Sequence, residues 1–201
     1  MGHWDETYAA RPETGLTWFE DRPVTSLALI DKAELPKGAA VVDVGAGASR
    51  LAGALIARGA GHVTLIDLSE DALNIAMRHV PAGASLSCVV GDVTEWVPDR
   101  AYDLWHDRAA FHFLVQPEQQ DRYIAALHKA LKPGGLVVLA TFAPDGPATC
   151  SNLPVMHYDD TALAARLGAR FTVLDSLRHV HVTPKGNEQP FTYLLAQRRE
   201  D

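Results

Sequence analysis

The chain of 201 residues is poor in cysteine, with only Cys88 and Cys150. Two cysteines make no disulfide framework, and such low usage is typical of a protein in a reducing compartment. The opening MGHWDETYAA lacks the apolar stretch of a signal peptide, and no apolar run approaches the ~20 residues that span a bilayer. These features predict a cytoplasmic protein without a membrane partner.

Basic residues are also scarce relative to acidic ones. The chain has 18 lysines and arginines against 25 aspartates and glutamates, which gives a formal net charge of −7. A general nucleic-acid binder needs a net basic face, so we expect no nucleic-acid partner. The length favours one domain with a single core, present as a monomer or a homodimer.

Apolar runs alternate with stretches of helical spacing along most of the chain. The apolar runs predict strands at 40–44, 62–67, 85–90, 102–107 and 136–142. The stretches between and after them predict helices at 49–59, 69–79, 117–131 and 162–168. The tail adds two strands joined by the turn-rich PKGNE, at 170–183 and 189–198, which predict a hairpin. This order predicts an α/β fold with a doubly wound, seven-stranded sheet, mostly parallel with an antiparallel C-terminal hairpin strand.

The first predicted strand ends in a glycine turn, VVDVGAGAS at 41–49. Gly45 and Gly47 let the backbone approach a ligand closely, and the following helix points unpaired N–H groups at it. A dinucleotide fingerprint has a third glycine where this chain has Arg50. The glycines alone therefore leave open a dinucleotide, S-adenosylmethionine or a plain turn.

Three acids at strand ends favour one of these ligands. Asp67 ends the second strand, where a carboxylate can accept hydrogen bonds from both ribose hydroxyls. Asp92 follows the third strand, where it can receive the amino group of adenine. Asp43 precedes the glycines and would repel an anionic pyrophosphate, whereas the methionine part of S-adenosylmethionine carries an ammonium and a sulfonium.

The motifs VVDVGAGAS, LIDLS, GDVTEW and LKPGGLVVLATF, in this order, resemble those of the class I S-adenosylmethionine-dependent methyltransferases over about residues 38–142. The resemblance implies a Rossmann-like sheet, S-adenosylmethionine as cofactor, and transfer of its methyl group to an acceptor. In that family the matching glycines line the methionine part, and the acids matching Asp67 and Asp92 bind the ribose and the adenine amino group. The cofactor-binding residues predicted on this basis are Asp43, Gly45, Ala46, Gly47, Asp67, Leu68, Gly91, Asp92, Val93, Asp107 and Trp18.

We therefore predict one methyltransferase domain over 1–201. It comprises an N-terminal lid or helical arm at 1–35, a cofactor-binding core at 36–142, and a substrate loop with the C-terminal hairpin at 143–201. Two other classes remain open. A nicotinamide-dependent oxidoreductase would bind a dinucleotide in the turn, and a non-catalytic module would bind the cofactor without turnover.

The segment WHDRAAFHFL at 105–114 follows the fourth strand, where the family carries acceptor-side residues. We expect Asp107 to accept a hydrogen bond from the substrate or the cofactor ammonium, Arg108 to bind a substrate anion, and His112 to act as a base. The alternatives are that Asp107 caps the next turn and that His112 packs at an interface. Trp18 and Phe19 are expected to close over the cofactor, by cation–π attraction to the sulfonium, or else to anchor the N-terminal arm with Trp4 and Tyr8.

The 141–160 segment is too long for a simple connection and predicts a substrate pocket. Its informative members are Phe142, Cys150, His157 and Tyr158, to which the last hairpin adds His179 and His181 on one strand face. The predicted substrate residues are Phe19, Arg108, Phe142, Cys150, Tyr158, His179 and His181. Cys150 with the histidines can in principle hold a soft metal or a metalloid, but no ligand spacing supports this and we expect no metal.

The favoured acceptor is an oxygen, nitrogen or sulfur nucleophile of a small molecule. The sequence is also distantly similar to the protein-lysine methyltransferases, which place Asp-Lys-Gly where this chain has Asp107, Arg108 and Ala109. The missing glycine argues against lysine methylation, which remains the second hypothesis.

Overall fold

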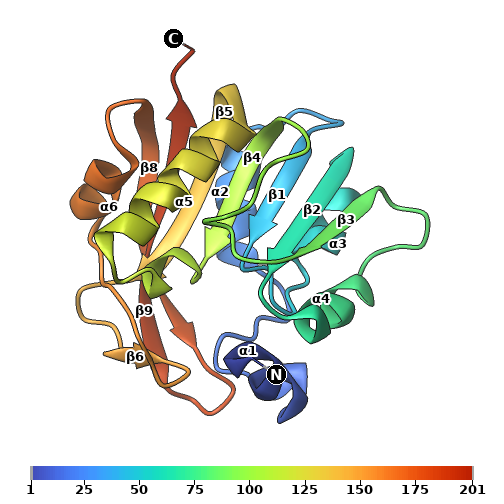
Figure 1. Cartoon of the computed structure of the whole chain (residues 1–201), viewed down its shortest axis with the longest axis vertical. Coiled ribbons are helices and arrows are strands. Elements are labelled where there is room, and N and C mark those ends of the chain that lie inside the picture. Colours follow the sequence, from blue (N-terminus) through green and yellow to red (C-terminus); the bar gives the residue numbers. More distant parts are fainter. Residues whose placement is uncertain (1, 201) are drawn as a thin grey trace.

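A computed structural model describes residues 2–200 of the chain. One sheet of seven strands forms its centre, in the order β3-β2-β1-β4-β5-β9-β8 (Figure 1). The first five strands are parallel, and β9 and β8 run antiparallel to their neighbours, so the predicted fold class is confirmed. These strands are β1 (Ala40–Val44), β2 (His62–Asp67), β3 (Leu86–Val90), β4 (Tyr102–Arg108), β5 (Leu131–Phe142), β8 (Phe171–Val182) and β9 (Glu188–Arg198).

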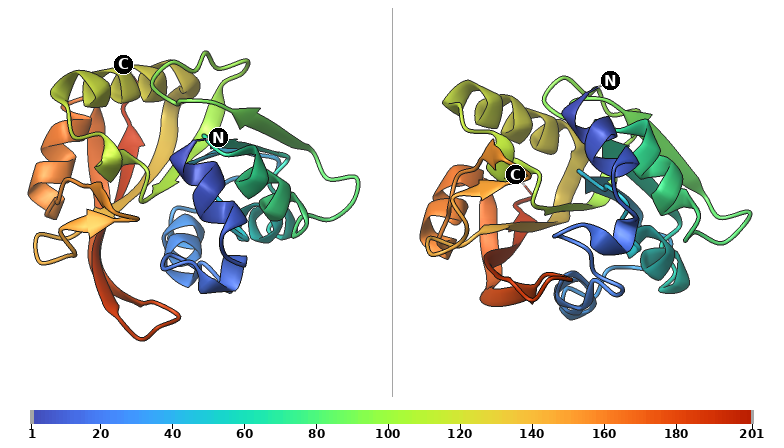
Figure 2. Two further views of the ribbon diagram at one scale, coloured as in Figure 1. Left: turned by 60° about the horizontal axis from the view of Figure 1, so that its bottom comes forward. Right: turned by 90° about the horizontal axis from the view of Figure 1, so that it is seen from below.

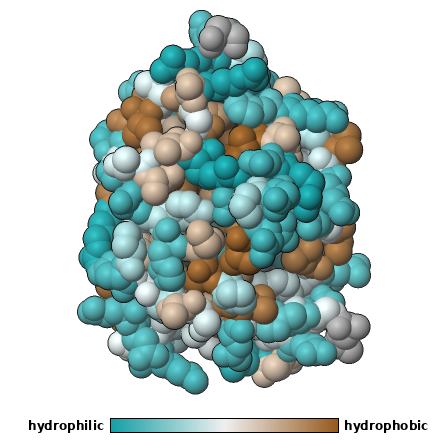
Figure 3. All heavy atoms as spheres, turned by 60° about the vertical axis from the view of Figure 1, so that its left-hand side comes forward, coloured by the Kyte–Doolittle hydropathy of each residue, from teal (hydrophilic) through white to brown (hydrophobic). Residues whose placement is uncertain are grey.

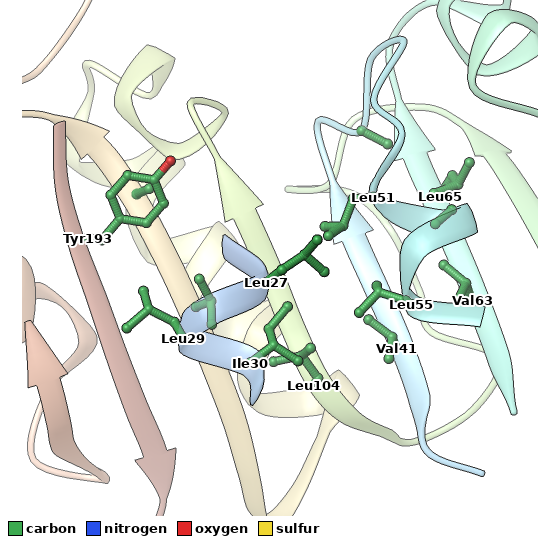
Figure 4. Packing of buried hydrophobic residues seen from close by; sticks show 14 of the residues in the cluster. Leu27, Leu29, Ile30, Val41, Leu51, Leu55, Val63, Leu65, Leu104 and Tyr193 are labelled. Carbon is green, nitrogen blue, oxygen red and sulfur yellow. The ribbon is translucent and has the colours of Figure 1, made fainter. Parts of the chain in front are cut away.

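Helices cover both faces of the sheet, as the near-continuous apolar strands require. Leucines and Ile30 of α2 meet strand residues such as Val41 and Leu104 on one face (Figure 4). Trp105, Tyr123 and Leu163 belong to the core of the other face. The first face carries α2 (Val24–Lys32), α3 (Leu51–Ala57) and α4 (Glu70–Met77), and the second carries α5 (Pro117–Ala130) and α6 (Asp160–Leu167).

Local signals place the helix starts. The Ser69 hydroxyl accepts a hydrogen bond from the Ala72 N–H at 3.3 Å, and the Asp159 carboxylate accepts one from the Ala162 N–H at 2.7 Å. Pro117 begins α5, where a missing N–H costs nothing. The helices therefore begin within one or two residues of their predicted starts.

The start of β5 differs from the prediction. The strand follows α5 directly at Leu131 and includes the residues KPGG, which were expected to precede a strand beginning at 136. Tyr102 of β4 pairs with Leu131 of β5, whereas Leu104 pairs with Leu136. The register between the two strands therefore shifts between these pairs. A bulge thus absorbs Pro133, which lacks an N–H, and Gly134, whose φ is +74°.

The N-terminal segment lies across the carboxyl ends of the central strands. Helix α1 (His3–Ala9) packs against α4, and the short 3-10 turn η1 (Glu13–Gly15) leads into a loop at 16–23 and then α2 (Figure 2). A second 3-10 turn, η2 (Phe111–Phe113), follows β4, and a small hairpin of β6 (Thr149–Cys150) and β7 (Leu153–Pro154) interrupts the long loop after β5. Segments from three parts of the chain thus cover the carboxyl ends of the central parallel strands.

The face around α6 and β8 is mostly hydrophilic, with hydrophobic residues in small separate groups (Figure 3). Among residues 2–200, no helix combines the length and apolar character that crossing a membrane requires.

Candidate active site

Two adjoining clefts open at the carboxyl ends of β1, β2 and β4, beside the point where the strand order reverses between β1 and β4. The larger cleft has a volume of about 1060 Å³ and lies over the ends of β2 and β3. The smaller cleft, about 570 Å³, lies between the glycine turn and the 16–23 loop. Trp18, Gly45 and Arg108 line both clefts, so the two clefts adjoin at these residues.

The turn between β1 and α3 requires its glycines. Gly45 and Gly47 have φ of +61° and +54°, in the left-handed region that other residues rarely adopt. A Cβ on Gly45 would lie 2.5 Å from the Cβ of Ala110, and one on Gly47 would collide with the Tyr8 hydroxyl. The turn therefore carries no side chains at Gly45 and Gly47, where the clefts meet, and a ligand can approach its backbone there.

Asp67 is held at the end of β2 with both carboxylate oxygens oriented. Oδ2 accepts the Gly47 N–H at 2.7 Å and Oδ1 accepts the Ser69 N–H at 2.9 Å. Each oxygen keeps acceptor capacity for one further donor, which suits a vicinal diol. Burial raises the pKa of Asp67 to about 6, and the nearby charge of Asp43 acts in the same direction.

The predicted adenine end lies in the larger cleft with Asp67. Leu68, Gly91, Asp92 and Val93 all line it. Asp92 is exposed, and its Oδ1 accepts the Thr94 N–H at 2.8 Å, which leaves Oδ2 available to an exocyclic amino group. The larger cleft thus presents a diol acceptor and an amino-group acceptor at neighbouring strand ends.

A buried chain of hydrogen bonds starts from Asp43 in the smaller cleft. Asp43 Oδ1 lies 2.7 Å from His106 Nδ1, and His106 Nε2 lies 2.8 Å from the Ser26 hydroxyl. Asp43 Oδ2 is buried without a partner. Sequence reasoning did not single out His106 or Ser26; the available signal was a histidine inside an otherwise buried strand, which needs polar partners.

Arg108 occupies the junction of the two clefts. Its Nε donates to the Tyr193 hydroxyl at 3.0 Å, and its Nη1 donates to the Trp18 carbonyl at 3.1 Å. The Glu20 carboxylate oxygen Oε2 lies 3.4 Å from the same Nε. Burial disfavours its charge, but Tyr193 and Glu20 outweigh this effect and raise the pKa of Arg108. Its Nη2 is buried without a partner.

Aromatic side chains form one wall of the larger cleft. Trp4 packs edge-on against Trp18, with ring centroids 6.0 Å apart, and against Phe113 at 5.1 Å, and Tyr8 meets Trp18 at 6.0 Å. Trp4 and Tyr8 were expected to be anchors, and they also line the cleft. Phe113 was not predicted, because nothing in the sequence distinguishes it from the core phenylalanine two residues earlier.

Asp107 and His112, the predicted catalytic pair, reach neither cleft, and their roles need correction. The Asp107 side chain is fully buried and accepts the Tyr123 hydroxyl at 2.6 Å and the N–H groups of Ala110 and Phe111. These donors fill its acceptor sites, so Asp107 caps the turn after β4. His112 is also fully buried, and desolvation lowers its pKa to about 3, so this ring is a poor base at neutral pH.

Four predicted substrate residues also lie outside the clefts. Phe142 packs against Phe191, and Tyr158 bonds to Gln120 at 2.9 Å. His181 is bound to the Thr17 carbonyl at 2.8 Å, and His179 lies against Tyr193. The strand alternation placed the two histidines correctly on one face, but that face meets the 16–23 loop and the core. The predicted substrate residues that do line a cleft are Phe19, Arg108 and Cys150.

Burial raises the pKa of the Cys150 thiol to about 11, so it stays protonated at neutral pH. Within the described part of the chain, no three histidine, cysteine or acidic side chains gather in a group that can hold a metal ion. Cys150 is therefore a neutral wall residue of the larger cleft.

The side chains and the backbone that line the two clefts match the chemical groups of S-adenosylmethionine. Asp67 offers two oriented oxygens to a ribose, and Asp92 lies beyond it for adenine. The glycine turn keeps side chains out of the junction, and Asp43 leaves a buried anionic oxygen beside it. An α/β sheet with a cleft at its switch point is the architecture that nucleotide-binding and nucleoside-binding proteins use.

Comparisons with known proteins agree with this architecture. The profile of a family described as a methyltransferase domain matches residues 41–135. The malonyl-[acyl-carrier protein] O-methyltransferase of Halalkalibacterium halodurans is 30% identical over 87 residues, which are 41% of this chain and 31% of that protein. The match thus spans about a third of the length of this relative.

Solved structures cover more of the chain. The 1,6-didemethyltoxoflavin-N1-methyltransferase of Burkholderia thailandensis, solved with 1,6-didemethyltoxoflavin and S-adenosylhomocysteine, is 26% identical. It has a TM-score of 0.69 and covers 89% of this chain and 80% of its own. The N-methyltransferase NodS of Bradyrhizobium japonicum, solved with S-adenosylhomocysteine, has a TM-score of 0.73 at 16% identity, over 98% of this chain and 99% of its own.

These comparisons support a class I S-adenosylmethionine-dependent methyltransferase, with the match to the methyltransferase-domain family over residues 41–135. S-adenosylmethionine is the cofactor of this family, and the resemblance inferred from the sequence motifs is confirmed.

Proposed function

We propose that the protein transfers a methyl group from S-adenosylmethionine to an oxygen, nitrogen or sulfur atom of a small molecule. The observation that carries the proposal is that two clefts adjoin at Gly45, one lined by Asp67 with room for two further donors and one lined by Asp43, whose Oδ2 has no partner. A single ligand with a nucleoside at one end and a cationic group at the other matches both. A dinucleotide would bring a pyrophosphate close to Asp43, which disfavours the oxidoreductase alternative.

The residues act mainly by binding and alignment. When bound, the cofactor supplies a methyl group on a sulfonium that is already activated. Asp67 orients the ribose hydroxyls, and Trp18 contributes an aromatic face at the junction of the clefts, where it favours a cation. Holding an acceptor in line with the transferred group lowers the barrier without a dedicated base. This reading agrees with the positions of Asp107 and His112 outside the clefts.

The rest of the larger cleft favours a small, largely apolar acceptor. Trp4, Phe113, Leu114 and Cys150 line the part away from the two acids. This observation supports a small-molecule acceptor over the protein-lysine alternative. The 1,6-didemethyltoxoflavin-N1-methyltransferase named above, solved with bound 1,6-didemethyltoxoflavin, accords with a small-molecule acceptor.

Calorimetry with S-adenosylhomocysteine, S-adenosylmethionine and NAD tests the cofactor assignment. We expect both adenosyl ligands to bind and NAD not to. Asp67→Ala should weaken S-adenosylhomocysteine binding by about 1.5–3 kcal/mol, because it removes a charged acceptor from two hydroxyls. Asp99→Ala, which removes an exposed acid outside the clefts, is the matched control and should leave the affinity unchanged. Binding of NAD alone would refute the proposal.

The acceptor is tested with cofactor carrying a labelled methyl group. A panel of phenols, amines, thiols and basic proteins separates the hypotheses. Label on a small molecule supports the proposal, whereas label on lysines of a protein supports the alternative. Cofactor binding with no transfer to any member of the panel, or to compounds extracted from cells, would favour a non-catalytic binding module.

A further inference from the structure

Arg108 is the only lysine or arginine among the described residues that line the two clefts. Its side chain is 10% exposed, and its Nη2 is buried without a hydrogen-bond partner in the described chain. Tyr193 and the Trp18 carbonyl accept from its Nε and Nη1, and Glu20 compensates its charge from the side of Nε. Because an unpaired charged donor is costly to bury, Nη2 indicates an oxygen atom supplied by a ligand.

Arg108 lies on the other side of β1 from the acids assigned to the nucleoside. Asp67 ends β2 and Asp92 follows β3, whereas Arg108 ends β4 and its guanidinium carbon lies 4.8 Å from the centre of the Phe191 ring on β9. The charge of Arg108 also acts to lower the pKa of the Cys150 thiol, which lines only the larger cleft. The free donor is therefore on the side of the junction that the nucleoside leaves to the methyl acceptor.

The wall of the larger cleft on this side is aromatic and uncharged. Trp4 packs edge-on against Trp18 and Phe113, with interplanar angles of 79° and 78°. All three rings line the cleft and are only half-buried, so part of each ring remains for a ligand to cover. Aromatic rings pack favourably against other rings. The wall therefore suits a flat aromatic molecule that brings one oxygen atom to Arg108.

The described residues that line the larger cleft include no side chain free to remove a proton from this molecule. Its titratable side chains are Tyr8, Asp67, Asp92, Arg108 and Cys150. The two aspartates serve the nucleoside in the proposed function, and arginine keeps its charge. Burial raises the pKa of the Tyr8 hydroxyl and of the Cys150 thiol, so both stay protonated at neutral pH. An acceptor that reacts here therefore needs a proton acidic enough to be lost to solvent.

A phenolic hydroxyl meets this condition with the help of Arg108. Its pKa is near 10, and one hydrogen bond from a charged donor to the oxyanion lowers this value to about 8–9. The other nucleophiles gain less from the same donor. An alkyl ammonium has no lone pair to accept with, an aliphatic alcohol is far less acidic, and sulfur is a weak hydrogen-bond acceptor.

We propose that the methyl acceptor is an aromatic molecule with a ring hydroxyl, whose oxyanion accepts a hydrogen bond from Arg108 Nη2 while its ring lies against Trp4 and Phe113. The inference rests on the proposed function and narrows its acceptor to one chemical class. The hydroxyl proton goes to solvent. The oxyanion forms the O–CH3 bond as the S–CH3 bond of the cofactor breaks, and the electron pair of that bond stays on sulfur. The products are an aryl methyl ether and S-adenosylhomocysteine.

The first test follows the ionisation of para-nitrophenol, whose anion absorbs visible light, on the full-length protein saturated with S-adenosylhomocysteine. The ionisation constant of the bound phenol should exceed that of the free phenol roughly ten-fold or more, the effect of one hydrogen bond from a charged donor. Arg108→Gln should abolish this difference. Arg178→Gln, which removes an exposed arginine bonded to Asp145 outside both clefts, is the control and should retain it.

The second test compares acceptors that share one ring and differ in the nucleophile, namely para-cresol, para-toluidine, para-thiocresol and para-methylbenzyl alcohol. With cofactor carrying a labelled methyl group, kcat/KM for para-cresol should exceed that for each of the others roughly ten-fold or more. Arg108→Gln should lower kcat/KM for para-cresol most near about pH 7 and progressively less toward about pH 10, where the free phenol ionises without the protein.

The outcomes separate this inference from the proposed function. If Arg108→Gln does not fold, the double variant with Glu20→Gln keeps the buried charge balanced and replaces it in both tests. Failure of S-adenosylmethionine and S-adenosylhomocysteine to bind the wild type would refute the function itself. Three results would overturn only the acceptor class: faster transfer to the amine, thiol or alcohol, no binding of para-nitrophenol, or an equal ionisation constant in wild type and variant.

Discussion

Three aspartates end three neighbouring parallel strands, and their hydrogen-bond partners give them different roles. Asp107 at the end of β4 is saturated by Tyr123 and two backbone N–H groups. Asp67 on β2 has one backbone donor on each oxygen and keeps room for two more. Asp43 on β1 has one oxygen on His106 and the other free. The same residue type near the end of a strand thus leaves no acceptor position open at Asp107, two at Asp67 and one oxygen without a partner at Asp43.

We expect Asp107→Ala to act on stability. The substitution strands the Tyr123 hydroxyl and two buried N–H groups, which should cost ~2–4 kcal/mol of the free energy of unfolding. Urea denaturation measures this loss. Asp145→Ala, which breaks only an exposed pair with Arg178, is the control and should change stability by less than ~1 kcal/mol.

A different result would restore a catalytic role to Asp107. If Asp107→Ala unfolded at the same urea concentration as the wild type while methyl transfer fell, the carboxylate would have to act on the reacting groups.

At the scale of elements, the site is made by a turn and a loop that meet. The β1–α3 turn passes under Tyr8 of α1 and against Ala110 after β4. The 16–23 loop is tied to the sheet where Arg108 holds the Trp18 carbonyl and His181 holds the Thr17 carbonyl. His181, expected to face substrate, therefore fixes the covering loop instead.

We expect Gly45→Ala to damage the site more than the fold. The new methyl group would require a left-handed φ and would meet the Cβ of Ala110 at 2.5 Å, so the turn must shift where the two clefts join. Calorimetry should show S-adenosylhomocysteine affinity falling by roughly ten-fold or more, as for the loss of a charged hydrogen bond.

Gly83→Ala is the matched control for this substitution. Gly83 has φ of +80°, but a Cβ there meets nothing within 4 Å. This variant should carry only the conformational cost, about 1–2 kcal/mol of stability, with unchanged affinity. Equal loss of affinity in both variants would show that strain, and not the approach to Ala110, governs binding.

At the scale of the whole molecule, binding at the switch point links the cofactor to the stability of the entire sheet. A ligand at 100 times its Kd stabilises the native state by about 2.7 kcal/mol, which raises the Tm of a domain of this size by about 5–10 °C. The stabilisation should depend on pH through Asp67, whose pKa burial raises from 3.8 to about 6.

The direction of this pH dependence follows from the raised pKa. Without ligand, protonation of Asp67 favours the folded state as the pH falls through about 6, because the buried carboxylate loses its charge. Ribose hydroxyls donate best to the ionised form. The Tm increase caused by S-adenosylhomocysteine should therefore be larger at pH 8 than at pH 5. Thermal unfolding in Asp67→Asn should show a smaller increase that varies little with pH, and an unchanged pH dependence would exclude Asp67 as its source.

The sequence by itself determined the order of strands and helices, the reversed hairpin, and the glycine turn with its acids. These features depend on local patterns of burial and on backbone conformations that only certain residues adopt. The cofactor residues predicted from the motifs line the two clefts, with Asp107 as the exception. Apart from Trp18, which lies in the 16–23 loop, each of the others lies at or just after a strand end, so local sequence was sufficient to find them.

Only the tertiary structure decided which polar groups stay open to a ligand. His106 finds Asp43 at a separation of 63 residues and Ser26 at 80, and Arg108 finds Tyr193 at 85. Strand periodicity says that such side chains are buried, but it does not say which donors fill their acceptors. Asp107 is closed because Tyr123 packs onto it from α5, whereas packing leaves Asp43 Oδ2 and Arg108 Nη2 without a hydrogen-bond partner.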